Sequence, residues 1–201
     1  MSRPRPWIVA VVALIIFLAD QASKAAVVRW LGMGGLWTPL AGRPDLFAFT
    51  VGANSGTACG YFPQLGTLFT FAPFVILAIV LIFYRQQQEP GWLLTVGTGL
   101  IIGGAFGNLA DRLRLGYVVD FIYVWHWPVF NVADAAVSTA VVLLLFWSLR
   151  EESKPAPEAG TTAAITSGAS WKLLLSFLVV LGVLAVLGIF VCVVIPANLF
   201  H

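Results

Sequence analysis

Two aspartates in the second half of the chain could do acid–base chemistry together. Asp120 follows the apolar residues GYVV, and Asp134 comes near the start of the next apolar run, in FNVADAAV. Like charges held ~3 Å apart cannot both ionise comfortably, so one carboxyl of such a pair keeps a proton. If both aspartates return to one membrane interface, they could share that proton, activate a water molecule and act as general acid and general base.

Asp134 also has a purely structural interpretation. It comes three residues after Asn131. An Asn at the N-cap and an acid at the third helical position can cap a helix start by themselves. The spacing leaves both interpretations open.

Asp20 and Lys24, in the motif DQASK, are the deepest charges of the first apolar segment. Four residues apart, they share one face of a helix. Asp20 lies ~20 Å from Trp7 along a helix that rises ~1.5 Å per residue, inside a hydrocarbon core of ~30 Å. An unpaired carboxylate there is costly. We therefore expect a structural Asp20–Lys24 ion pair, with direct participation in chemistry as the alternative.

A further polar group lies in GNLADR, where Asn108 and Arg112 flank Asp111. The simple interpretation is an interfacial Asp111–Arg112 ion pair. Alternatively, the guanidinium of Arg112 holds a substrate backbone or a lipid head group through its fixed donors. Asn54, in ANSG, belongs to the same outer layer, although such an Asn is often only a turn residue. Asp111 itself receives no role.

Other catalytic arrangements are poorly supported. His126 and His201 are the only histidines, so the serines have no obvious relay. Cys59 lacks a nearby basic partner. Cys59 and Cys192 lie far apart without metal-ligand spacing, so we expect neither a zinc site nor a disulfide framework.

The composition predicts a membrane protein. The 201 residues are 60% hydrophobic and 10% charged, whereas a soluble domain carries roughly 25% charged residues. The net charge of +2 and the absence of a basic tract give no sign of nucleic-acid binding.

Five apolar segments approach or reach the ~20 residues of a membrane-spanning helix. They lie at 7–31, 65–84, 92–109, 132–149 and 173–195. No small-x-small cleavage site ends the first one, so we expect it to be retained. Residues 151–172 are rich in Pro, Ala, Ser and Thr and predict a flexible linker.

Local patterns refine this plan. The stretch LFAFTVGANSG (46–56) predicts a short strand pair at the interface. Gly99, Gly103 and Gly107 recur every four residues, which favours close helix packing on one face. Six Lys and Arg residues lie on the same side of the membrane as the N-terminus, and four lie on the other side. This bias predicts a cytoplasmic N-terminus. Loops 32–64 and 110–131 then face outward.

The motifs DQASK, NSGTACG, GGAFGNLADRLRLGYVVDFI and FNVADAAV resemble, in order, those of the lipoprotein signal peptidases, the aspartyl membrane proteases of bacteria. The resemblance covers residues 7–149. Cys59 stands where that family usually has Phe, and residues 150–201 lie outside its common four-helix body.

The resemblance implies that Asp120 and Asp134 form the catalytic dyad. It also implies a surrounding group that lines the substrate pocket or supports the site: Asn54, Gly56, Asn108, Arg112, Asn131, Asp20 and Lys24. The implied substrate is a prolipoprotein, cleaved just before a diacylglyceryl-modified cysteine, without metal or cofactor. We expect a monomer that contacts membrane lipid.

The implied fold is an all-α integral membrane protein of the bacterial cytoplasmic (inner) membrane, with its active site facing the periplasm or cell exterior. Four transmembrane helices would carry a small periplasmic β-cradle, with an additional C-terminal transmembrane helix. The expected division is a catalytic membrane domain (1–150), the linker (151–172) and the additional helix (173–201).

Two rival functions remain open at this point. In a small transporter or proton- or ion-conducting protein, intramembrane Asp and Lys residues would form a path across the bilayer. Such a path should continue to the inner face, whereas here the acids gather at one edge. In an assembly factor, the outer loops would bind a partner.

Overall fold

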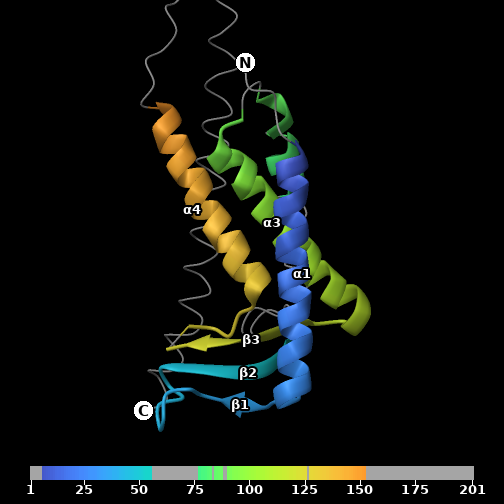
Figure 1. Cartoon of the computed structure of the whole chain (residues 1–201), viewed down its shortest axis with the longest axis vertical. Coiled ribbons are helices and arrows are strands. Elements are labelled where there is room, and N and C mark those ends of the chain that lie inside the picture. Colours follow the sequence, from blue (N-terminus) through green and yellow to red (C-terminus); the bar gives the residue numbers. More distant parts are fainter. Residues whose placement is uncertain (1–5, 56–76, 83, 88–89, 126, 153–201) are drawn as a thin grey trace, which may run out of the picture.

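The computed structural model describes residues 6–55, 77–82, 84–87, 90–125 and 127–152. Three long helices, α1 (Pro6–Leu31), α3 (Trp92–Leu115) and α4 (Val132–Glu152), run alongside one another. A three-stranded sheet of β1 (Leu36–Trp37), β2 (Phe47–Asn54) and β3 (Val118–Val124) lies at one end of them (Figure 1). The molecule is therefore a mostly helical membrane fold with a small sheet.

All three helices are long and apolar enough to cross a membrane, α4 over Val132–Arg150. A shorter apolar helix, Leu77–Gln86, falls in the second half of the expected 65–84 segment. Residues 65–76 and the expected helix at 173–195 lie outside the described residues. Of the expected linker, 151 and 152 are the last residues of α4, and 153–172 are outside the described part.

The expected end of the third helix at 109 was wrong. α3 continues to Leu115, because ADRLRL is a good helix-forming sequence and Asp111 is buried rather than leaving the bundle. The helix ends at Gly116, which has φ +82° and donates its N–H to the Arg112 carbonyl at 3.1 Å. Glycine adopts this left-handed conformation without steric cost.

The predicted packing role of the glycine stripe is confirmed. A Cβ on Gly99, Gly103 or Gly107 would come within 3 Å of α1. Gly104 faces α4 instead, where a Cβ would lie 2.7 Å from the Ala133 carbonyl oxygen. α3 therefore packs closely against both neighbours, and small residues allow this approach.

The sheet is antiparallel, in the order β1-β2-β3. Residues 46–56 were predicted to form a short strand pair, but their described part contains a single strand, β2, which pairs with β1 and β3. Its longer partner is β3, which was expected only as an apolar run and not as a strand. An irregularity in register between Phe49 and Gly52 brings Gly52 opposite Asp120. The sheet thereby fixes Asp120 beside the helix ends.

Candidate active site

Asp120 is held by two side-chain amides. Its carboxyl group is buried in β3, and the residue is 4% exposed. Asn54 Nδ2, from β2, donates to Oδ2 at 2.8 Å, and Asn131 Nδ2 donates to Oδ1 at 2.7 Å. Both partners are neutral, so they orient the carboxyl group without fixing its charge.

Asp134 lies in the first turn of α4 and forms the predicted capping arrangement. Its backbone N–H donates to Asn131 Oδ1 at 3.0 Å, and its Oδ2 accepts the Asn131 backbone N–H at 3.3 Å. Its Oδ1 accepts from Asn108 Nδ2 at 2.9 Å. The cap is thus real, and it also orients Asp134 toward α3.

Asn131 joins the two aspartates. Besides binding Asp120 and Asp134, its Nδ2 donates to Asn108 Oδ1 at 3.1 Å. Asn131 is completely buried. One network of amides therefore positions both carboxyl groups, from β2, the segment before α4, and α3.

The surroundings of Asp120 favour its protonated form. Burial, followed by the charge of neighbouring Asp134, raises the pKa of Asp120 to about 6. The hydrogen bonds from Asn54 and Asn131 and the charge of Lys24 oppose this rise. Near neutral pH, Asp120 can therefore exchange a proton, as a catalytic carboxyl must.

A second carboxylate pair surrounds Lys24. Its Nζ lies 2.8 Å from Asp20 Oδ2, so the predicted ion pair is confirmed. The same Nζ lies 2.8 Å from Asp111 Oδ2 and donates to Asn108 Oδ1 at 3.0 Å. All three charged residues are buried, at 0–3% exposure. Buried charges require such pairing.

Asp111 thereby acquires a place in the fold. It pairs with Lys24 rather than with Arg112, and its Oδ2 accepts the Val119 backbone N–H at 3.1 Å. Asp20 makes a similar backbone contact with α4, because its Oδ1 accepts the Ala133 N–H at 3.0 Å. Asp20 thus ties the residue before Asp134 to α1, and Asp111 ties the residue before Asp120 to α3.

Sequence reasoning missed Gln21. Its Nε2 contacts Asp20 Oδ2, the Gly107 carbonyl and Asp111 Oδ1 at 3.0–3.2 Å, and its Oε1 accepts from Arg114. The only signal was its position inside DQASK, next to Asp20. Spacing alone could not show that this amide links α1 to α3.

The expected site residues are largely brought together. Asp20, Lys24, Asn54, Asn108 and Asn131 all join the network around the two aspartates. Arg112 is half-buried and its Nη1 contacts the Asn108 carbonyl at 3.4 Å, whereas Gly56 lies outside the described residues.

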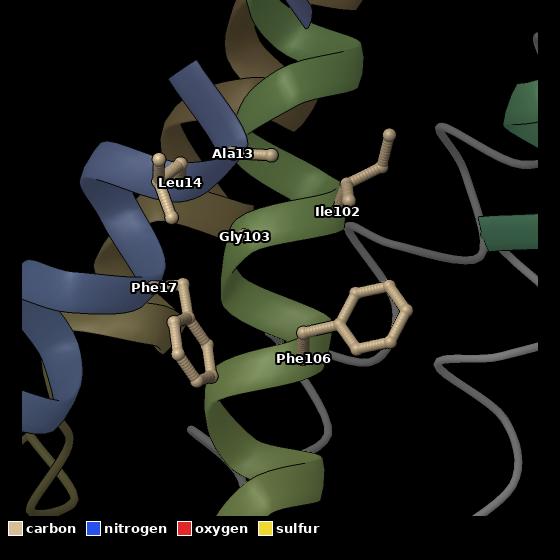
Figure 2. A pocket seen from close by; sticks show the side chains of 6 residues that line it. All are labelled: Ala13, Leu14, Phe17, Ile102, Gly103 and Phe106. Atoms are coloured by element: carbon tan, nitrogen blue, oxygen red, sulfur yellow. The ribbon is translucent and has the colours of Figure 1, made fainter. Parts of the chain in front are cut away.

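Other candidate sites are less developed. Among the residues that the structure describes, no group of three His, Cys, Asp or Glu side chains could hold a metal ion. An apolar groove of about 300 Å³ lies between α1 and α3, lined by Ala13, Leu14, Phe17, Ile102, Gly103 and Phe106 (Figure 2). These side chains offer packing surface but no acid–base group.

The comparisons with known proteins agree with this class of site. A family model described as Signal peptidase (SPase) II matches residues 12–150. A lipoprotein signal peptidase of Pelotomaculum thermopropionicum is 42% identical over 71% of this chain and 91% of its own length. One of Halothermothrix orenii is 39% identical over 72% and 97%.

Solved structures show the same architecture. Two bacterial membrane enzymes determined by the in meso method are each 26% identical to this chain, with TM-scores of 0.62 and 0.64. The matches cover 71% and 76% of this chain and 92% and 94% of those chains. A membrane-embedded protease of the aspartic type is the class that these findings define. The chain belongs to the signal peptidase II family.

Proposed function

We propose that Asp120 and Asp134 are the catalytic dyad with which this chain removes the signal peptide from prolipoproteins. The bond cleaved would precede a diacylglyceryl-modified cysteine. One observation carries the proposal: two carboxyl groups share a partly buried network of neutral amides at the sheet end of the spanning helices. The curated relatives are named for lipoprotein signal peptide cleavage, which supplies the substrate class.

Asp120 would begin the reaction protonated and Asp134 ionised. Asp134 lies in the first turn of α4, where the positive end of the helix favours a carboxylate. It would take a proton from water as that water attacks the scissile carbonyl. Asp120, with its pKa raised to about 6, would polarise the carbonyl and then protonate the leaving amine. The peptide bond breaks to give a free amine on the lipidated cysteine and a carboxyl group on the signal peptide.

The polar groups beside the dyad would hold the substrate backbone. Asn54 is exposed while it donates to Asp120, so it can contact a bound peptide. Arg112 is half-buried near Asn108, and its guanidinium offers donors to peptide carbonyls. The lipid chains of the substrate would hold its cleavage site on the outer side of the bilayer, near these groups.

A cleavage assay tests the proposal. The full chain is purified and incubated with a diacylated prolipoprotein in lipid, and the products are identified by mass spectrometry. We expect one cut, directly before the lipidated cysteine. The matched control is the same precursor without its diacylglyceryl group, which should be cleaved far more slowly. Absence of cleavage by a folded enzyme, or cleavage elsewhere, would overturn the proposal.

A transporter is disfavoured because the charged network does not extend along the helices. Toward the opposite end from the sheet, the described core is mainly apolar, with residues such as Leu94, Ile101 and Leu144. Its buried polar residues, Thr95, Thr98 and Ser148, carry no charge. A proton or ion path would need ionisable groups there. Proteoliposomes should accordingly show no flux of protons or metal ions that Asp120→Asn abolishes.

We further propose a division of the chain, its oligomeric state and its location. We assign 1–150 as the catalytic domain, 151–172 as a linker and 173–201 as an additional transmembrane helix. The enzyme would be a monomer of the bacterial inner membrane with its sheet outside. Deleting residues 155–201 should leave cleavage intact but change expression or partner co-purification. If expression and partner co-purification both stay unchanged, the additional helix has no role in stabilising the protein or in recruiting a partner.

A further inference from the structure

The sheet end of the molecule carries a cluster of aromatic rings, which we call the aromatic cluster: Trp30, Trp37, Phe47 and Phe49. Trp30 and Trp37 have ring centroids 5.0 Å apart, and Trp37 stacks on Phe49 at 6.0 Å. Phe47 meets Phe49 edge-on at 5.3 Å. The cluster therefore joins the last turn of α1 to β1 and β2.

Much of this cluster is exposed. Trp30 is 57% exposed and Trp37 is 41% exposed. Large apolar neighbours on the same α1–β2 segment are exposed as well: Met33, Leu36, Leu40 and Leu46. Contiguous exposed apolar surface of this kind marks an interaction site rather than an ordinary water-facing surface.

The cluster continues the lipid-facing surface of α1. Val11, Ile15 and Leu18 are exposed at spacings of three and four residues. Ala22 and Ala26 extend this exposed stripe to Trp30. Because α1 is a spanning helix, its exposed apolar stripe faces lipid, and the aromatic cluster is the end of that stripe.

Helix geometry places the cluster at the bilayer boundary. Trp7 and Trp30 are both exposed, near opposite ends of α1, and are separated by ~35 Å at ~1.5 Å per residue. This separation slightly exceeds a hydrocarbon thickness of ~30 Å. Tryptophan is enriched at both membrane–water interfaces. The two rings therefore mark the two interfaces.

The same geometry relates the cluster to the dyad. Asp20 precedes Trp30 by ten residues, or ~15 Å along α1. Asp20 also accepts the N–H of Ala133, directly before Asp134. The depth at which Trp30 lies in the interface thus sets the depth of the dyad.

Charge around the cluster matches a phospholipid surface. Arg29, Arg43 and Arg114 are exposed at this end. Asp45, the exposed acid beside them, forms an ion pair with Arg43. The exposed charge of these four residues is positive, which complements lipid phosphates.

We propose that the aromatic cluster anchors the sheet in the head-group region of a phospholipid bilayer and thereby sets the depth of Asp120 and Asp134. The anchoring stands on the surface alone. The consequence for cleavage rests on the proposed function, because the lipid chains of the substrate fix the scissile bond at a defined depth.

A spin-label experiment tests the anchoring without reference to activity. The full chain, with both cysteines replaced by alanine, carries a nitroxide at Leu36→Cys, at Leu18→Cys or at Asp45→Cys. It is reconstituted in vesicles of phosphatidylethanolamine and phosphatidylglycerol. The label at 36 should be intermediate: more accessible to oxygen and less accessible to a water-soluble nickel chelate than the label at 45, and more accessible to the chelate than the label at 18. If it resembles the label at 45 instead, the anchoring proposal is wrong.

A cleavage experiment tests the depth setting. The double variant Trp30→Ser/Trp37→Ser is compared with Trp30→Phe/Trp37→Phe, which keeps apolar rings. In the same vesicles we expect the serine variant to lose about tenfold in kcat/KM, because its side chains bury less apolar area in the membrane interface. The phenylalanine variant should lose little. In detergent micelles both should match the unchanged enzyme.

An equal loss of the serine variant in both media would overturn the depth setting, since it would indicate packing or direct contact with the substrate polypeptide. If the serine variant does not fold, the label at 36 still decides the anchoring. If the unchanged enzyme cleaves nothing, the proposed function fails while the labels report on the anchor.

Discussion

Two pairs of carboxyl groups lie in one network, and they are held in different ways. Asp20 and Asp111 share the ammonium group of Lys24, each at 2.8 Å. Asp120 and Asp134 receive hydrogen bonds from asparagine side chains instead. The first pair has a lysine side chain between its members, and the second pair has only neutral donors.

The two pairs show how a membrane protein can keep structural acids beside acids that are available for proton exchange. A cation in direct contact balances the buried charge of both neighbouring carboxylates, so this pair serves to hold α1 and α3 together. Asn108 separates the two pairs, because its Oδ1 accepts from Lys24 while its Nδ2 donates to Asp134. The dyad therefore feels the charge of Lys24 without forming an ion pair with it.

The largest expected effect comes from breaking the amide-held pair. Asp120→Asn and Asp134→Asn keep the side-chain shape but remove the group that exchanges a proton. Each should lower kcat by about 10²–10⁴-fold. The thermal unfolding temperature in detergent should stay near that of the unchanged protein, since no ion pair is lost. Full processing by a folded variant would contradict the assignment of the dyad.

Removing the cation should break the other pair. Lys24→Met leaves Asp20 and Asp111 buried without their partner, which costs about 3–5 kcal/mol of unfolding free energy. Unfolding in detergent with increasing denaturant measures this loss. Arg43→Met is the matched control, because its ion pair with Asp45 is more than half exposed, and its effect should be much smaller. Equal stability of the two variants would refute a structural role for Lys24.

A methyl group can disturb the cation-held pair without changing its charges. In Gly107→Ala the new Cβ would lie 2.6 Å from Asp20 Oδ2, so Asp20 or the helices must shift. We expect a loss of about 1–3 kcal/mol in unfolding free energy. Gly91→Ala serves as the control, because its Cβ would make ordinary contacts at 3.8 Å with Trp147. If Gly107→Ala is as stable as the control, the helices are less closely packed than described.

The smallest effect should be a shift of the pH profile. Burial and Asp134 raise the pKa of Asp120 to about 6, and Asp120 must be protonated to act as the acid, so activity should fall as pH rises through this value. Asn54 stabilises the ionised form. Asn54→Leu should therefore raise the pKa and move the alkaline limb of kcat upward by about 0.5–1 unit.

The profile is measured as kcat over a pH series with saturating substrate. Thr50→Val, on the same strand but outside the contacts of Asp120, provides the control and should leave the limb in place. A shift of the Asn54→Leu limb to lower pH would show that Asp120 is not the protonated member.

Local features of this site were readable from the sequence. The Asn131–Asp134 cap and the Asp20–Lys24 pair depend on spacings of three and four residues within one helix turn. The hydrophobic pattern likewise placed α1 and α4 within a few residues, because both helices are uniformly apolar. These are contacts and periods that neighbouring residues decide.

Long-range contacts were not readable from spacing. Lys24 and Asp111 lie on different helices, and the sequence offered Arg112 as the nearer partner for Asp111. Burial decided the outcome, since Lys24 is enclosed between two acids and Arg112 is partly exposed. The pairing of β3 with β2 was likewise hidden, because VVDFIYV alternates too weakly to separate a strand from an apolar return to the membrane.

We propose that the amide-held carboxyl groups do the chemistry and that the cation-held ones hold the fold. The most direct test gives each pair the same chemical change and measures cleavage of a diacylated prolipoprotein per folded molecule. Asp120→Asn should abolish cleavage while unfolding at the unchanged temperature. Asp111→Asn should unfold at a lower temperature yet retain most of its cleavage. The reverse pattern, with cleavage kept by Asp120→Asn and lost in folded Asp111→Asn, would contradict the account.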